Sequence, residues 1–262
     1  MISGLAVDTL MNNKNRFAPD RLIPLDQGEI AGWMTRPDIT LEFDAIARHI
    51  DFVNQSIVQE MEDIKAAALE YVQELGLDDQ DEEGAHYEHH RYLDDRNFHF
   101  LSAFPQIQWR AEFLLVYSFF EHTLNQLCLH VQKRSNFELS YKDSKGNGIC
   151  RARNYLIKVA GVKDTFIAPT NWERARLLGD IRNAITHKNG EIEYTPDNAK
   201  SLCARMIKAK MINESLIQLK RDIPPQKDAE IVLSYEFVKQ SISEFQVVVM
   251  EVCNYRLYAD KS

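Results

Sequence analysis

The sequence predicts an all-α protein: a helical bundle with a long N-terminal helical extension and a small β-hairpin near the C-terminus. Apolar residues recur every three or four positions along most of the chain, which is the period of an amphipathic helix. One pair of short apolar stretches, near residues 217 and 231, flanks a turn-prone segment and indicates two strands. With 262 residues, 45% of them hydrophobic, the chain is long enough to bury a sizeable core.

Residues 1–104 are expected to form the extension. Residues 1–36, with prolines at 19 and 24 and another at 37, are expected to be an irregular arm. A long amphipathic helix is predicted from about residue 40 to 75, and it can pack either on the core or on a partner chain. Its apolar positions are Ile46, Ile50, Val53, Ile57, Met61, Ile64, Ala68, Tyr71 and Leu75. Residues 76–95 are acidic and are expected to be a loop or linker.

Residues 105–262 are expected to form the helical core. The spacing of apolar residues predicts helices at about 105–133, 147–160, 171–188, 196–212 and 235–258. The hairpin is expected from Leu216–Leu219 and Glu230–Leu233, which flank Pro224 and Pro225.

Charge is distributed unevenly along the chain, whose formal net charge is −8. Between residues 37 and 99 there are seventeen acidic and four basic residues, whereas residues 131–190 contain twelve basic and five acidic ones. A local polyanion site needs such a basic segment. The alternative is that both segments are ordinary solvated surfaces.

Cysteine usage and hydropathy bear on where the protein works. The four cysteines form no CxxC pair and no evident disulfide framework, which suits a reducing cytosol. The N-terminus has no secretory h-region and no apolar run approaches membrane-spanning length, so secretion and membrane insertion are not expected. No phosphate-cradling glycine-rich loop is present, and no cofactor is expected.

The most informative stretch is Leu178–Gly190, LGDIRNAITHKNG. It places Arg182 five residues before His187 on a predicted helix that Asn189 and Gly190 are expected to end. Arginine can hold a phosphate by its planar, permanently charged fork, and histidine can move protons near neutral pH. Together they are sufficient, in principle, to cleave a phosphodiester without a metal.

The Arg182-Asn183-x-x-x-His187 pattern near the end of a core helix resembles the signature of the HEPN (higher eukaryotes and prokaryotes nucleotide-binding) superfamily. The resemblance covers roughly residues 105–258 and is weak outside the motif. It implies an all-helical fold, a homodimer with a composite active site and metal-independent RNA cleavage. It also implies that Arg182 and His187 are catalytic, with Asn183 as the polar residue that follows the arginine.

Glu121 matches a further feature of the family, an acidic residue on an early core helix that faces the motif arginine. It shares a helical face with apolar residues, so it is expected to be partly buried and therefore paired. The candidate partners are Arg182 and Arg110. One family branch carries a tyrosine two residues after the histidine, where this chain has Asn189. Silencing by nucleotide transfer to such a tyrosine is therefore not expected.

Helical geometry constrains the motif. At about 100° per residue, Arg182 and His187 point about 140° apart, so one straight helix does not easily aim both at a single phosphate. Two copies packed across a two-fold axis can bring both pairs to one cleft. Gly179 fits that arrangement, because a mid-helix glycine usually has a close-packing reason. The alternative is that Gly179 packs on a neighbouring helix of its own chain.

Several other residues are candidates for chemistry. If RNA binds, its expected contacts are Lys188, Arg174, Arg176, Arg151 and Arg153, although a plain basic helix face is the preferred interpretation of residues 150–155. His86 and His90 have a spacing that can hold a metal ion on a helix. They lack a third ligand from a distant element, so no metal site is expected and a solvated acidic linker is the preferred interpretation.

Two functional hypotheses follow. The first is an endoribonuclease in which His187 is the general base and Arg182 stabilises the phosphate charge, leaving 2′,3′-cyclic phosphate and 5′-hydroxyl ends. The resemblance implies a growth-arrest or anti-phage toxin restrained by an antitoxin or regulatory protein. The second is a non-catalytic helical dimer that binds RNA, a nucleotide or a protein partner. The acidic region before residue 100 favours this second hypothesis.

Overall fold

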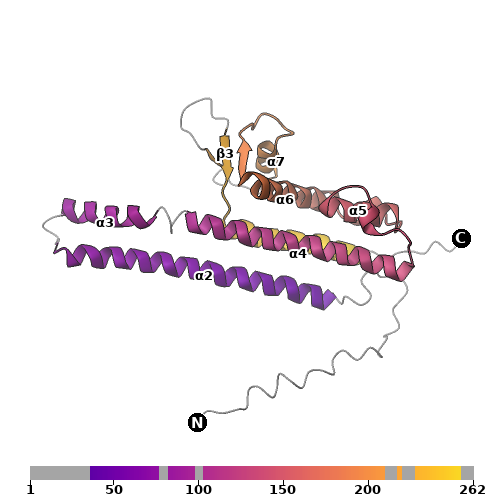
Figure 1. The fold of residues 1–262 in the computed structure, drawn as a ribbon, viewed down its shortest axis with the longest axis horizontal. Helices are drawn as coiled ribbons and strands as arrows, with labels where there is room; N and C mark the ends of the chain where they lie inside the picture. Colours follow the sequence, from indigo (N-terminus) through magenta and orange to yellow (C-terminus); the bar gives the residue numbers. More distant parts are fainter. Residues whose placement is uncertain (1–35, 77–81, 98–102, 210–216, 220–227, 255–262) are drawn as a thin grey trace, which may run out of the picture.

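The computed structural model describes residues 36–76, 82–97, 103–209, 217–219 and 228–254. Long helices lie side by side, with a small sheet and a short helix at one side (Figure 1). In chain order the elements are α2 (Arg36–Glu74), α3 (Glu82–Asn97), α4 (Phe104–Ser135), the 3-10 helix η2 (Tyr141–Asp143), α5 (Gly148–Lys158), the 3-10 helix η3 (Asp164–Phe166), α6 (Pro169–Lys188), β1 (Glu191–Glu193), α7 (Leu202–Lys208), β2 (Ile217–Leu219), β3 (Asp228–Ile231) and α8 (Tyr235–Asn254). The predicted all-α fold with a small β element is confirmed.

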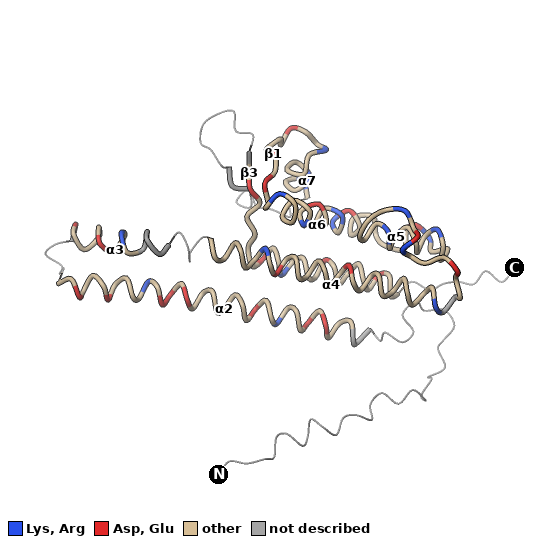
Figure 2. The backbone as a smooth tube through the Cα atoms, in the orientation of Figure 1, with Lys and Arg blue, Asp and Glu red and all other residues tan. Residues whose placement is uncertain are grey.

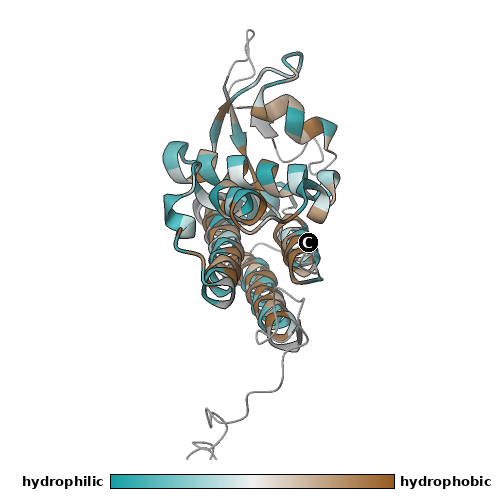
Figure 3. Ribbon diagram, turned by 90° about the vertical axis from the view of Figure 1, so that its right-hand side faces the viewer, coloured by the Kyte–Doolittle hydropathy of each residue, from teal (hydrophilic) through white to brown (hydrophobic). Residues whose placement is uncertain are grey.

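The core lies where α4, α6 and α8 pack on one another. Their apolar faces meet through aromatic rings: Phe120 and Phe245 stack with centroids 4.2 Å apart, and Phe113 packs on Phe237 at 5.4 Å. Figure 3 shows the bundle along its long axis, with α6 above α4 and α8 and with α2 below them. Burying these faces is the main contribution to folding stability.

Helix α2 packs on α8 and α4 of its own chain, which is the first of the two expected arrangements. Ile39, Phe43, Ile50 and Ile57 belong to the same hydrophobic cluster as the core of α4 and α8. The first half of α2 is therefore part of the bundle, and the cluster is continuous across the expected boundary at residue 104. Except for Arg36, the predicted N-terminal arm lies outside the described residues.

Residues 82–97 form helix α3, so the prediction of an acidic loop or linker over 76–95 is wrong for these positions. Helix α3 folds back on α2, where Tyr92 stacks on Tyr71 at 5.0 Å and Arg91 donates to the Tyr71 hydroxyl at 3.3 Å. The sequence of α3 has little amphipathic pattern, because α2 covers only a narrow strip of the surface of this helix. Among the described helices, none has both the length and the apolarity required to cross a bilayer.

The sheet is antiparallel with strand order β1-β3-β2. The predicted pairing near the C-terminus is confirmed, since in the backbone register Ile217 pairs with Ile231 and Leu219 with Ala229. Strand β1 extends this hairpin into a three-stranded sheet. It was not predicted, because three residues are too few to show the alternation of apolar and polar residues that is typical of a strand. The helix predicted at 196–212 is shorter, Leu202–Lys208, and residues 210–212 lie outside the described chain.

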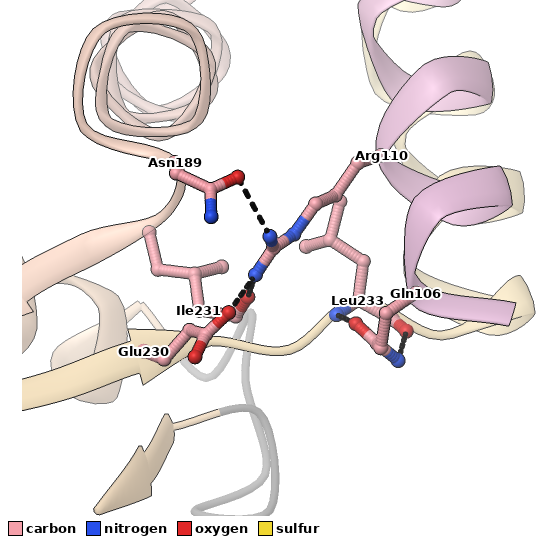
Figure 4. A network of polar contacts seen from close by, with 6 residues as sticks. All are labelled: Gln106, Arg110, Asn189, Glu230, Ile231 and Leu233. Atoms are coloured by element: carbon pink, nitrogen blue, oxygen red, sulfur yellow. Dashed lines mark hydrogen bonds and ion pairs between the residues drawn. The ribbon is translucent and has the colours of Figure 1, made fainter. Parts of the chain in front are cut away.

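Arg110 ties the sheet to α4 and to the end of α6 (Figure 4). Its guanidinium donates to Glu230 Oε1 at 2.6 Å, to the Ile231 carbonyl at 2.9 Å and to Asn189 Oδ1 at 3.3 Å. One helical turn away, the Gln106 amide makes two 2.8 Å hydrogen bonds with the backbone of Leu233. These contacts fix the end of α6 relative to α4.

Candidate active site on helix α6

The sequence motif lies on α6, whose ends are set by local residues. Pro169 occupies the first turn, where its missing N–H group has no intrahelical acceptor to lose. The helix ends at Asn189, which adopts the left-handed conformation (φ 51°) and donates its N–H to the Ala184 carbonyl. The predicted stop is therefore confirmed, and His187 and Lys188 lie exposed in the last turn. The buried face of α6 contains Trp172, Ala175, Leu178, Ile181 and Ile185, which recur at the three- and four-residue spacing of an amphipathic helix.

The guanidinium of Arg182 is held from two sides. Its Nη1 donates to Asn183 Oδ1 at 3.0 Å, and its central carbon lies 5.6 Å from the centroid of the Tyr117 ring on α4. Both contacts orient the side chain, one by a hydrogen bond and one by the attraction of a cation to an aromatic face. Arg182 is partly buried and makes no ion pair with any described carboxylate. Its charge therefore remains available to an anion.

Gly179 allows Tyr117 to lie close to α6. A Cβ atom at position 179 would be 2.9 Å from the Tyr117 hydroxyl oxygen, nearer than real Cβ contacts come. Glycine in a helix interior costs about 1 kcal/mol relative to alanine. This close approach is within one chain, so of the two explanations for Gly179 the structure supports packing on a neighbouring helix of its own chain.

Tyr117 is a neutral phenol in this arrangement. Burial of the ring raises the pKa of Tyr117 well above its usual value, and the nearby Glu121 carboxylate raises it further, while Arg182 acts in the opposite direction. An ionised phenol is thus disfavoured. Tyr117 contributes an aromatic face and a hydrogen-bonding hydroxyl to the site rather than a base.

Glu121 is partly buried, as expected, but neither of its predicted partners pairs with it. No ion pair joins it to Arg182, and Arg110 is engaged with Glu230 instead. The predicted pairing is therefore wrong. The Glu121 carboxylate faces Gly148, the first residue of α5, where a Cβ atom would lie 3.4 Å from Oε1. The positive end of the α5 dipole favours a carboxylate at this place.

Two hollows open on either side of α6. A hollow of about 250 Å³, here called the arginine hollow, is lined by Arg182, Arg176, Tyr117, Glu121 and the start of α5. A hollow of about 470 Å³, here called the histidine hollow, contains His187 and lies between α6, β1 and the segment leading to α7. Asp180 and Asn183 line both hollows.

Arg182 and His187 thus line different hollows of one chain, in agreement with their divergence of about 140° on the helix. Asp180 and Asn183 form the ridge between them. Asp180 is fixed there by a 2.7 Å ion pair with Arg205 of α7. A ligand that reaches both motif residues therefore has to cross this ridge or to lie between two copies of α6.

The five basic residues expected to contact RNA are only partly brought together. Arg176 lines the arginine hollow, although it also pairs with Glu173 at 3.1 Å, and Lys188 lines the histidine hollow. The other three are engaged elsewhere. Arg151 donates to the Gly146 carbonyl, Arg153 pairs with Asp164 and covers the Trp172 ring, and Arg174 binds Glu244 of α8 through Nε and Nη2.

The charge asymmetry of the sequence is also present in three dimensions. Acidic residues run along α2 and α3, whereas basic residues gather on α5 and α6 around the motif (Figure 2). On α3 the rings of His86 and His90 lie 4.3 Å apart. Within the part of the chain that the structure describes, no group of three or more metal-binding side chains is close enough to hold one ion.

Sequence reasoning missed three parts of the site. The role of Tyr117 was not predicted, although a glycine inside a helix, at position 179, indicates that a bulky neighbour lies close to it. Asp180 was not singled out. The segment from β1 to α7, which forms a wall of the histidine hollow, has no motif that would have identified it.

Comparisons with protein-family models, with curated proteins and with solved structures found no match. Function is therefore inferred from the site itself.

Proposed function

We propose that this protein is a metal-independent endoribonuclease. His187 removes the proton from a ribose 2′-hydroxyl, the 2′-oxygen attacks the adjacent phosphorus, and the bond to the 5′-oxygen breaks. A water molecule or His187 of a second subunit supplies the proton to the departing 5′-oxygen. The products are a 2′,3′-cyclic phosphate and a 5′-hydroxyl, and DNA resists because it lacks the nucleophile.

The observation that carries the proposal is the state of Arg182. Asn183 and Tyr117 hold its guanidinium in place, and it makes no ion pair with a described carboxylate, although Glu121 and Asp180 line the same hollow. A charge that is oriented before the substrate arrives stabilises a developing negative charge without reorganisation during the reaction. The exposed His187 lies on the same helix, so the acid–base group and the phosphate-binding group are separated by a fixed distance.

The active unit is proposed to be a homodimer with a composite site. In one chain Arg182 and His187 line separate hollows, so a single copy does not direct both toward one opening. Pairing two copies of α6 about a two-fold axis would place two arginines and two histidines along one cleft. An isologous interface of this kind is the commonest arrangement of soluble dimers.

The proposed role is growth arrest or anti-phage defence in the cytoplasm, with an antitoxin or regulatory protein that restrains cleavage. This role rests on the resemblance of the Arg182-Asn183-x-x-x-His187 pattern to HEPN toxins. It requires inhibition, because an unrestrained ribonuclease would stop the growth of its own cell.

A second candidate function is non-catalytic binding of RNA, a nucleotide or a protein by a helical dimer. The acidic residues along α2 and α3 favour its protein-binding form, since a basic protein partner would find complementary charge there (Figure 2). In this case Arg182 and His187 would only make structural contacts.

Incubation of purified protein with total RNA in the presence of EDTA distinguishes the two. We expect cleavage to continue, and the new 5′ ends to accept labelled phosphate without prior phosphatase treatment. His187→Ala should abolish cleavage, whereas His122→Ala, which changes an exposed histidine of α4 outside both hollows, should not. Absence of cleavage in the wild type would support the binding function instead, whereas equal cleavage by the two variants would show that His187 is not the general base.

A further inference from the structure

We infer that the histidine hollow recognises the base of one unpaired nucleotide in an RNA strand. The inference rests on the proposed function and specifies its substrate, which is RNA with at least one unpaired nucleotide. The hollow measures about 470 Å³ and lies between the last turns of α6, strand β1 and residues 194–202. This volume is within the range of about 300–1,000 Å³ that is typical of small-ligand pockets.

The walls of the hollow are already formed. Three backbone-anchored hydrogen bonds fold residues 195–201: Asn198 N–H to Thr195 O at 3.1 Å, Ser201 N–H to Asn198 O at 2.8 Å, and Ser201 Oγ to Thr195 O at 2.8 Å. Ser201 also caps α7 by accepting from Ala204 N–H. A preformed wall reduces the entropy lost when a ligand is bound.

The lining of the hollow matches the faces and edges of a base. Ala184, Ile192 and Leu202 supply apolar surface for the flat faces. Asn198 accepts a hydrogen bond from Lys200 N–H through Oδ1 at 3.1 Å, which leaves its amide protons to donate. Thr195 adds a hydroxyl. Amide and hydroxyl groups are the side chains that pair with base edges in nucleic-acid complexes.

Charge assigns the base, rather than the phosphate, to this hollow. Three carboxylates, those of Asp180, Glu191 and Glu193, line it against two lysines, Lys188 and Lys200, whereas the arginine hollow has two arginines against two carboxylates. The balance in the histidine hollow is therefore less favourable to a phosphate, and the Glu193 carboxylate can accept hydrogen bonds from exocyclic amines. The phosphate is better placed across the Asp180–Asn183 ridge, on the side of Arg182. A base in a duplex would have to unstack and unpair before it could enter, so the preferred strand is single.

The test measures binding apart from cleavage. The probe is a short labelled oligodeoxynucleotide, which lacks the 2′-hydroxyl and cannot be cut by the proposed reaction. Fluorescence anisotropy measures the affinity of the full chain for this strand, both as a single strand and annealed to its complement. Ala184→Leu fills the hollow and Asn198→Ala removes an amide donor. Thr186→Leu adds similar bulk to an exposed position of α6 outside both hollows and serves as the control.

We expect the free strand to bind more tightly than its duplex. Ala184→Leu and Asn198→Ala should each weaken binding of the free strand about fivefold, the loss expected for one hydrogen bond or its equivalent. Thr186→Leu should bind as the wild type does. Melting curves establish that each variant is folded; if Ala184→Leu unfolds, Asn198→Ala decides.

Failure of this inference and failure of the proposed function give different results. If the wild type cleaves RNA but Asn198→Ala binds the free strand as tightly as the wild type, the base pocket is wrong and the nuclease stands. If the free strand binds in the hollow and no RNA is cleaved, the pocket stands and the nuclease is wrong. Equal affinity for the free strand and the duplex overturns the inference.

Discussion

At the scale of single residues, the contact between Arg182 and Tyr117 is the feature with the most functional consequence. The Tyr117 ring makes a cation–π contact with the guanidinium, and Asn183 Oδ1 accepts a hydrogen bond from it. An arginine that is not held would sample many rotamers, and fixing them on binding costs free energy. In the proposed reaction Tyr117 is therefore expected to position Arg182 rather than to take part in proton transfer.

Replacing Tyr117 tests this positioning role. Tyr117→Leu removes the aromatic face, and we expect kcat for RNA cleavage to fall about fivefold, in line with about 1 kcal/mol for a cation–π contact. Tyr117→Phe keeps the face and should keep kcat. Single-turnover cleavage assays below the melting temperature measure both. A purely structural role predicts that kcat follows stability in both variants, with no rescue by phenylalanine.

Arg182→Lys tests whether the planar fork is needed. Lysine keeps the charge but presents a point ammonium, which loses the two-pronged contact with a phosphate and the planar stacking on the Tyr117 ring. We expect cleavage to fall by about 10- to 100-fold. Arg176→Lys, in the same hollow, is the matched control and should lose far less. Similar losses in the two variants would mean that general basicity, not the Arg182 geometry, supports activity.

At the scale of helices, the crossing of α4 and α6 at Gly179 sets the position of the motif. Gly179→Ala should lower stability by about 1 kcal/mol, because the new methyl group meets the Tyr117 hydroxyl at 2.9 Å. In the Tyr117→Phe background the nearest atoms are ring carbons at 3.6 Å, an ordinary contact. There the same substitution should stabilise by up to about 1 kcal/mol, because alanine favours the helix.

Urea unfolding of the four proteins in this cycle gives the interaction energy directly. A change of sign between the two backgrounds is the expected result. If Gly179→Ala is equally harmful in both, the glycine is required for another reason, such as close approach of a second copy of α6.

The contact of α2 with α8 should depend on pH through Asp51. Hydrogen bonds from Lys239 and Tyr235 lower the pKa of Asp51 below its ordinary value of 3.8, and the bond from Lys239 has the larger effect on this pKa. A group whose pKa is lower in the folded state stabilises above its unfolded pKa and loses that contribution as pH falls through the folded pKa. Asp51 therefore stabilises the docking of α2 at neutral pH but not in strong acid.

Thermal melting of wild type and Asp51→Asn over a pH series tests this contact. At neutral pH the variant should melt slightly lower, by the modest amount typical of a partly exposed pair. Below pH about 4 the two curves should converge. A difference that stays constant down to strong acid would show that the ionised carboxylate is not what stabilises the contact.

At the scale of the whole molecule, the division of Arg182 and His187 between two hollows predicts that activity belongs to a dimer. Adding excess His187→Ala protein to a fixed amount of wild type should depress activity beyond simple dilution, because mixed dimers carry an incomplete site. Sedimentation velocity determines the assembly state at the assay concentrations. Full activity of a monomeric wild type would contradict the composite site.

Local sequence patterns were sufficient to predict most of the long helices. The spacing of apolar residues placed α2, α4, α6 and α8 within a few positions, and Asn189-Gly190 placed the end of α6. Helix α3 was missed because its sequence has little apolar periodicity and its acidic residues are typical of loops. Contacts of Tyr92 and Arg91 with Tyr71 of α2 stabilise it as a helix, and no local pattern contains them.

The sequence alone determined the helical bundle, the pattern Arg182-Asn183-x-x-x-His187 and the divergence of its two ends, because these depend on the period of one helix. Only the tertiary structure decided which groups surround the motif. Tyr117 rather than Glu121 contacts Arg182, Gly148 rather than an arginine faces Glu121, and residues 195–202 form one wall of the hollow that His187 lines. Contacts between elements depend on how each helix is rotated and how far it slides along its neighbour. Those quantities follow from packing of the whole core and not from any single segment.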